Sequence, residues 1–242
     1  MAFIGKKPTD APLTSSDVAD GIITNAKLAQ DIISADTALG AEPADTDEFL
    51  VSDAGTLKRM DYSHIKASSA WTLIKTETAS SSSAITFAHG TSDVTFDSTY
   101  KIYCIIGQSI VSASNNVELN LYTSNDGGSS YETSYDETDT RGFSSSSSIS
   151  ITNNTSVIGH SGSFGNASGK NGSIIVWCPS PSESGTFHTV YGDSIVNDDQ
   201  GYVRRGMFAG MHETAEAYNA IKFAMSSGNI ASGTFSLYGV AT

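Results

Sequence analysis

The sequence predicts a mainly β chain in two parts: a short intertwined N-terminal stem over residues 1–67, and an antiparallel, jelly-roll-like β-sandwich knob over residues 68–242. Three observations support this fold class. A ten-residue repeat begins at residue 13, apolar and polar residues alternate with a period of two from Trp71 onward, and turns rich in glycine and asparagine separate the alternating segments. No segment predicts a helix of more than about three turns.

The first twelve residues predict an irregular anchoring arm. Pro8 and Pro12 oppose regular structure, and Phe3 and Ile4 form the one bulky apolar pair of this segment. The side chains that we expect to anchor the arm are Phe3, Ile4, Lys6, Lys7 and Pro8.

The repeat occupies residues 13–38 in three blocks. The blocks begin at Leu13, Ile23 and Ile33, and each of these residues is followed by serine or threonine. Such a short block contains too few apolar side chains to offset the conformational entropy lost on ordering. We therefore expect the blocks to share a core with neighbouring chains, which makes the protein an oligomer.

Residues 45–66 predict a hairpin followed by a short helical segment. Asp53, Ala54 and Gly55 form a turn signal between two strand-like segments, and residues 62–66 have a helix-like pattern. A two-stranded hairpin is marginally stable alone in water, so this element also needs a partner surface.

The remaining residues predict about eight to ten strands in an antiparallel sandwich of jelly-roll type. Alternation is clearest in residues 117–122, 221–225 and 235–239. The nearly continuous apolar runs at residues 100–106 and 174–178 predict central strands that are covered on both faces.

Composition excludes several classes of partner and cofactor. A net charge of −13 without lysine and arginine clusters argues against binding to nucleic acid. No apolar run approaches the about 18 residues of a membrane span, so we expect no membrane insertion. No zinc-type spacing of cysteine and histidine occurs, and we expect no cofactor and no metal. Cys104 and Cys178 lie in apolar runs and predict two buried thiols, with a disulfide as the open alternative.

Motifs that could carry catalysis are weak. Residues 192–195 (GDSI) resemble the nucleophile block of GDSL esterases, but Ala209 stands where that family has the aspartate of Asp-x-x-His, so a turn after a strand is expected. Residues 124–131 fit an Asp-box, which predicts a hairpin. The acidic residues 132–139 predict a solvated polar loop, and Asp198 with Asp199 leaves a calcium site open as an alternative. We expect no enzymatic activity.

Two polar segments carry aromatic and arginine side chains of the kind used in recognition. Such residues suit contacts with a glycan or a protein, and they suit contacts between subunits equally well. The candidates are Tyr131, Tyr135, Arg141 and Phe143 in the first segment and Tyr202, Arg204 and Arg205 in the second.

Several blocks resemble tail-fibre-like proteins of marine and cyanobacterial bacteriophages. Residues 5–13 (GKKPTDAPL) and 20–29 (DGIITNAKLA) resemble the N-terminal part of those proteins, and residues 47–59 (DEFLVSDAGTLKR) are similar to another of their recurrent blocks. Residues 221–239 (IKFAMSSGNIASGTFSLYG) resemble the closing hairpin of a phage virion β-domain.

This resemblance implies a non-enzymatic structural protein of the virion, assembled in the host cytoplasm. The expected form is a short homotrimeric tail fibre whose N-terminus docks on the phage tail or another virion protein. Its C-terminal knob would contact a glycan or protein of the host surface. The alternatives are a capsid decoration or head-fibre protein and a surface-glycan depolymerase.

Overall fold

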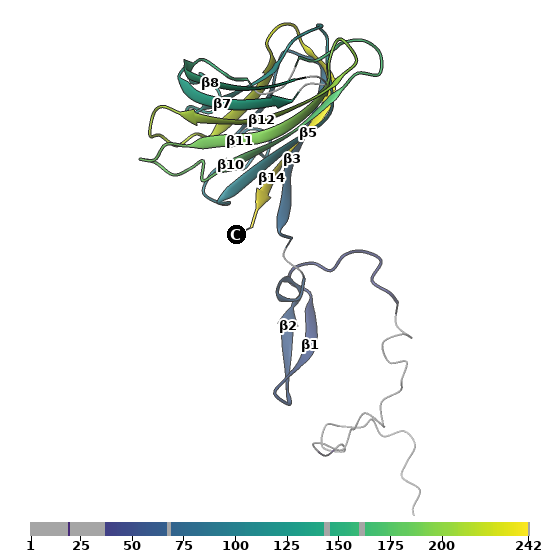
Figure 1. The fold of residues 1–242 in the computed structure, drawn as a ribbon. Coiled ribbons are helices and arrows are strands. Elements are labelled where there is room, and N and C mark those ends of the chain that lie inside the picture. The colour runs from purple at the N-terminus through teal and green to yellow at the C-terminus, as the bar shows by residue number, and fades with distance from the viewer. Residues whose placement is uncertain (1–18, 20–36, 67–68, 143–145, 160–162, 242) are drawn as a thin grey trace, which may run out of the picture. The chain divides into compact units, whose positions relative to one another are not determined.

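The structure is a computed structural model that describes residues 19, 37–66, 69–142, 146–159 and 163–241 (Figure 1). The predicted arm and nearly all of the repeat lie outside the described residues. The chain divides into two compact units, Met1–Ala67 and Ser68–Thr242. No helix in the described ranges reaches the length and apolarity that a membrane span requires.

The described part of the first unit is the hairpin that the sequence predicts. Strands β1 (Glu48–Asp53) and β2 (Thr56–Asp61) pair antiparallel, and the short helix η3 (Tyr62–His64) follows them. Ala54 and Gly55 connect the strands with φ angles of 49° and 86°. Two successive positive φ angles define a type I′ turn, whose twist matches that of the paired strands.

The second unit is a mainly β, antiparallel sandwich, as predicted. The larger sheet contains, in spatial order, β3 (Trp71–Ser82), β14 (Ile230–Val240), β5 (Ile102–Ser112), β10 (Gly172–Pro179), β11 (Thr189–Asn197), β12 (Val203–His212), β7 (Tyr135–Gly142) and β8 (Ser147–Thr155). The smaller sheet contains β4 (Ile85–Ala88), β13 (Ala220–Met225), β6 (Leu119–Ser124) and β9 (Ile158–Gly159). The sheets therefore have eight and four strands. A jelly roll has eight strands in total, arranged as two Greek keys. The sandwich is therefore jelly-roll-like only in having two packed antiparallel sheets.

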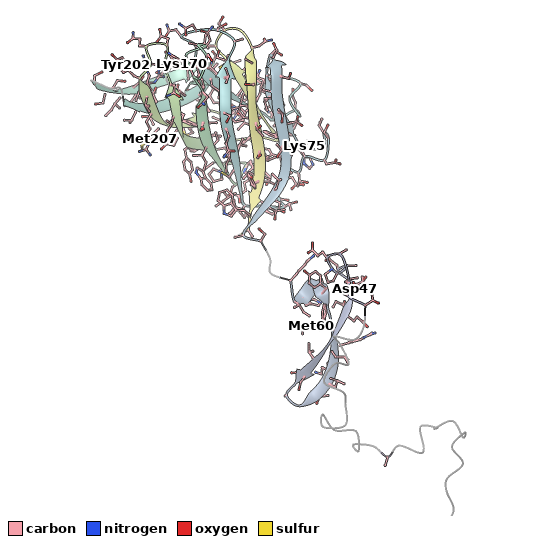
Figure 2. All side chains as sticks on the ribbon, turned by 90° about the vertical axis from the view of Figure 1, so that its right-hand side faces the viewer. Asp47, Met60, Lys75, Lys170, Tyr202 and Met207 are labelled. Carbon is pink, nitrogen blue, oxygen red and sulfur yellow. The ribbon has the colours of Figure 1, made fainter. Side chains whose placement is uncertain are left out.

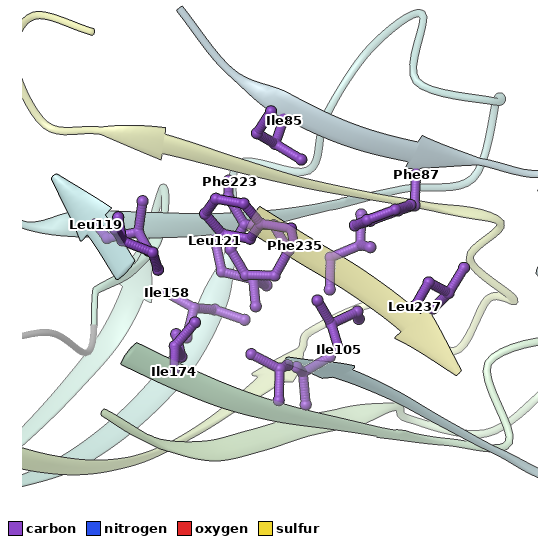
Figure 3. Close-up of a cluster of buried hydrophobic side chains, with 14 of the residues drawn as sticks. Ile85, Phe87, Ile105, Leu119, Leu121, Ile158, Ile174, Phe223, Phe235 and Leu237 are labelled. Carbon is purple, nitrogen blue, oxygen red and sulfur yellow. The ribbon is translucent and has the colours of Figure 1, made fainter. Parts of the chain in front are cut away.

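The core lies between the two sheets (Figure 3). Phe223 on β13 and Phe235 on β14 face each other with ring centroids 5.3 Å apart. Leu121 and Leu237 are completely buried beside them. The predicted alternation is confirmed in residues 221–225 and 235–239, because every second side chain of these strands enters this core.

The larger sheet is covered by a second layer on one face, which corrects the prediction for residues 174–178. In β10, Ile174, Val176 and Cys178 are buried against the core, whereas Ile175 and Trp177 are half-buried on the other face. The run is apolar because Ile175 and Trp177 pack against neighbouring side chains on the outer face of the sheet. No further layer of the described chain covers that face.

Candidate binding surface

The candidate contact residues form two groups at opposite ends of β7, and the first predicted segment is divided between them. Tyr131 and Tyr135 lie where β7 begins, at the end where the chain enters the unit through Trp71. Arg141 lies where β7 ends, beside the start of β12, which carries Arg204 and Arg205. We call this second end the distal end. Phe143 lies outside the described residues.

The first group does not form a contact surface. Tyr135 is completely buried, and its hydroxyl oxygen accepts a hydrogen bond from the Thr123 backbone N–H at 2.9 Å. It was expected on a contact loop and is instead a core residue. Tyr131 is half-buried and covers the Lys222 ammonium, which lies 3.6 Å from its ring centroid. Burial lowers the pKa of Lys222.

The Asp-box forms its local turn but does not close a hairpin. Asp126 accepts hydrogen bonds from the Ser130 hydroxyl at 2.6 Å and the Ser130 N–H at 2.8 Å, and these bonds lower its pKa to about 2. Strand β6 belongs to the smaller sheet and β7 to the larger sheet. The turn therefore carries the chain from one layer to the other, and the hairpin prediction is wrong.

The acidic segment before Arg141 is a buried strand and not the solvated loop that was predicted. Glu137 and Asp139 are 9% and 4% exposed, because alternate residues of β7 face inward while Thr138 and Thr140 face outward. Arg141 donates to Glu118 at 2.6 Å and to Asp139 at 3.0 Å. The guanidinium of Arg141 therefore holds an internal ion-pair cluster and is largely withdrawn from external contact.

Burial raises the pKa of Glu137 to about 7, and the neighbouring Asp139 carboxylate adds to this effect. Arg141 and the Gly159 backbone N–H act in the opposite direction. One carboxylate oxygen of Glu137 is buried without a hydrogen-bond partner among the described residues. The protonated form is therefore favoured in the folded chain below neutral pH and is still populated near pH 7.

A second buried carboxylate organises the distal turn. Asp198 is 1% exposed and accepts hydrogen bonds from the Tyr202 N–H at 2.7 Å, the Gln200 N–H at 3.0 Å and Arg204 Nε at 2.7 Å. Lys170 Nζ donates to the Asp198 carbonyl oxygen. Burial raises the pKa of Asp198, but these hydrogen bonds and the Arg204 charge outweigh it, so the pKa lies below its usual value.

These contacts argue against a calcium site at Asp198 and Asp199. Both carboxylate oxygens of Asp198 are occupied by donors from the protein itself. Within the part of the chain that the structure describes, no three histidine, cysteine, aspartate or glutamate side chains gather closely enough to hold a metal ion. Asp198 therefore shapes the turn through its own hydrogen bonds.

The distal turn presents Tyr202 in a fixed position. Its N–H is bound by the Asp198 carboxylate and its carbonyl oxygen accepts the Asp198 N–H at 2.9 Å, while the ring is exposed. Lys170 lies at the same end of the sandwich (Figure 2). An exposed aromatic ring on a preorganised turn loses little conformational entropy on binding, which makes Tyr202 the best-supported contact residue.

The two adjacent arginines have different surroundings. Arg204 is mostly buried and bound to Asp198. Arg205 is largely exposed on the outer side of the larger sheet, where its Nε lies 2.9 Å from Asp193 Oδ2. Of this predicted pair, Arg205 is therefore the one available to a partner.

The esterase-like block lies inside β11 and not in the turn that was predicted. Ser194 is buried, and its hydroxyl donates to the Gly206 carbonyl oxygen at 3.4 Å.

No protein-family model, curated protein or solved structure matches the chain.

Sequence reasoning missed an exposed surface, the outer face of the larger sheet. It carries Tyr191, Ile195 and Met207, which are exposed although they belong to central strands. Shallow hollows of about 400 and 480 Å³ lie on this face. A detectable signal is the presence of apolar residues at both alternating sets of positions in β11, since Val190 and Val196 fill the inner set.

Proposed function

We propose that the chain is a non-enzymatic structural protein of a phage virion, a short homotrimeric tail fibre. In this proposal the N-terminal residues dock on the tail and the C-terminal sandwich contacts a glycan or protein of the host surface. The observation that carries the proposal is the uncovered apolar surface of the hairpin β1–β2.

The hairpin exposes side chains that a stable element would bury. Leu50 and Leu57 are 75% and 69% exposed on one face, and the rest of the described first unit does not cover them. On the other face, Phe49 contacts Tyr62 at a centroid distance of 6.1 Å. Covering a leucine side chain contributes about 1.5–3 kcal/mol, so association with further copies would stabilise the hairpin substantially.

The repeat that precedes the hairpin supports the same arrangement. It predicts a shared core between chains, and the hairpin continues that requirement to residue 61. A trimer would display three copies of the Tyr202 turn on one particle component. Three weak contacts on a common support raise the effective concentration of each, which suits attachment to a repetitive host surface.

The first test is the mass of the full-length protein and of two matched variants. Leu57→Asp places a charge on the uncovered face, whereas Thr56→Asp places the same charge on the neighbouring exposed residue at the turn. We expect a trimer for the wild-type protein and Thr56→Asp, and dissociation for Leu57→Asp, measured by sedimentation equilibrium. A wild-type protein that is monomeric at micromolar concentration would overturn the trimer.

The second test locates the protein on the particle. Gold-labelled antibody against the sandwich should mark the tail in electron micrographs of phage particles. Label on the capsid would favour a decoration or head-fibre protein instead, and shortening of host polysaccharide by the purified protein would favour a depolymerase.

A further inference from the structure

The outer face of the larger sheet is continuous across all eight strands. It consists of the side chains that point away from the smaller sheet. The strand register joins one row of these residues from Leu73 on β3, through Trp177 and Tyr191, to Ile151 on β8. A parallel row contains Ile175, Asp193 and Met207, and Met207 is 53% exposed. Figure 2 labels Met207 on this sheet. Large apolar side chains that gather on an exposed sheet face mark a candidate binding surface.

The charge distribution favours a second copy of the same chain as the occupant. Each chain carries a net charge of −13, so copies repel each other except through surfaces without excess negative charge. In the strands between the two edges, the outward-pointing charged residues are Asp193 and Arg205, which neutralise each other, and Asp136 on β7, so the face carries little net charge. This face is therefore suited to close approach between two acidic molecules.

The edge strands point to the same partner. Strand β8 is exposed along nearly its whole length, contains neither charge nor proline, and displays Ile149 and Ile151. Natural proteins protect free sheet edges with charges, prolines or bulges. Both edges have a register shift, near Leu73 in β3 and between Thr152 and Thr155 in β8, but β3 also has the charged residues Lys75 and Glu77. The edge without charged residues, β8, is therefore the less protected of the two.

The size of the face also fits an interface between proteins. Eight strands at about 4.8 Å spacing span roughly 35 Å, and five residues along a strand add roughly 17 Å. The resulting area of roughly 600 Å² per copy approaches the roughly 800 Å² per partner of a standard interface. Its exposed large apolar residues include Leu73, Ile149, Ile151, Ile195 and Met207, and such aliphatic side chains favour a protein partner over a glycan.

We infer that the outer face of the larger sheet, together with the open edge of β8, is covered by a second copy of the chain. The inference rests on the self-association in the proposed function, and it adds a contact in the second unit to the one in the hairpin. The distal turn with Tyr202 then remains the part of the sandwich that is free for the host surface.

Oxidation of Met207 by hydrogen peroxide tests this directly in the full-length protein. A covered Met207 should be oxidised at least about tenfold more slowly in the native protein than in urea, read by mass spectrometry, because sulfoxide formation follows exposure. Met225, which is buried in the core, gives the rate for a protected methionine. Oxidation of native Met207 within about twofold of its rate in urea would overturn the inference.

A pair of variants links any protection to the sheet face. Ile195→Glu adds a negative charge on the outer face, and Thr86→Glu adds the same charge on the exposed side of the smaller sheet. Met207 should become reactive in Ile195→Glu and stay protected in Thr86→Glu. Continued protection in Ile195→Glu contradicts the inference.

Sedimentation equilibrium on the same samples separates the two proposals. If the protein is an oligomer but Met207 is reactive, the proposed sheet contact is excluded and the hairpin contact is retained. If the protein is a monomer, both proposed contacts are excluded. A monomer with protected Met207 means that the chain's own N-terminal residues cover the face. Protection that appears only on addition of host polysaccharide identifies a glycan as the occupant, and either result overturns the second copy.

Discussion

Arg204 Nε lies 2.7 Å from Asp198 Oδ2, and this ion pair closes the distal turn around a carboxylate that is almost inaccessible to water. Asp198→Asn keeps an oxygen for the backbone donors but leaves the guanidinium without its counter-charge. We expect the free energy of unfolding to fall by about 3 kcal/mol, as for other broken buried ion pairs. Asp199→Asn, at the half-buried neighbour, should change it by less than about 1 kcal/mol in the same urea titrations.

The pH dependence of this difference has a definite sign. Because the pKa of Asp198 is lowered in the folded state, its stabilising contribution is complete above the usual aspartate pKa and is lost as the pH falls through the folded value. The difference in the free energy of unfolding between wild type and Asp198→Asn should therefore become smaller in acid. A gap that stays constant down to pH 2 would show that the charge of Asp198 does not stabilise the turn.

Glu137 should produce the opposite dependence. Its pKa is raised from 4.5 to about 7, so the folded state holds a proton that the unfolded state releases. Stability is then lost as the pH rises from about 4.5 through about 7. Glu137→Gln has no such titration, so its free energy of unfolding should not show this loss. Between pH 4 and pH 8, the free energy of unfolding of wild type should therefore fall by about 2–3 kcal/mol relative to that of Glu137→Gln.

Urea titrations across this pH range measure the effect, with Asp136→Asn as the control. Asp136 precedes Glu137 on β7 and points to the other face of the sheet. The control should retain the wild-type decline between pH 5 and pH 8. Parallel curves for wild type and Glu137→Gln would exclude a buried protonated carboxyl group.

Period-two patterning predicted the fold where the two faces of a strand differ in polarity. In residues 221–225, Lys222 separates the buried Ile221 and Phe223, so the core face is evident from sequence. The turn at Ala54 and Gly55 was predictable from Gly55, because glycine adopts a positive φ angle readily, whereas the positive φ angle of Ala54 was not.

The same reasoning failed where burial contradicts residue type. Glu137 and Asp139 alternate with threonines, but acidic residues are expected in water, and the sequence does not show that Arg141 and Glu118 meet them inside the sandwich. The outer face escaped notice for the opposite reason. Tyr191 and Ile195 are apolar, so each taken alone resembles a core residue, and only the apolar residues at both alternating sets of positions in β11 indicate a second apolar face.

Gly192 is required by close packing in the middle of β11. A Cβ atom there would overlap the Ile175 carbonyl oxygen and lie 2.7 Å from the Phe208 ring. Gly192→Ala should therefore lower the free energy of unfolding by about 2–3 kcal/mol. Gly142→Ala is the matched control, because its Cβ would meet no atom closer than the Arg205 carbonyl oxygen at 3.8 Å. Similar urea midpoints for the two variants would contradict the steric argument.

The two cysteines cannot form a disulfide, which resolves the alternative left open by the sequence. Cys104 is opposite Trp177 in the pairing of β5 with β10, and Cys178 is the next residue, so the thiols point to opposite faces of the sheet. Both are free and buried, and burial raises the pKa of each thiol to about 12.

Neither thiol should therefore react with a disulfide reagent in the native protein at pH 8, because the thiolate is the reactive form and water does not reach it. In urea both should react, giving two thiols per chain. Under native conditions both should be labelled at a single slow rate that equals the rate of global unfolding, since Cys104 and Cys178 belong to paired strands. Faster labelling of Cys104 alone would mean that the aromatic cover on the outer face, where Trp71 packs on Trp177 at a centroid distance of 5.4 Å, opens independently of the core.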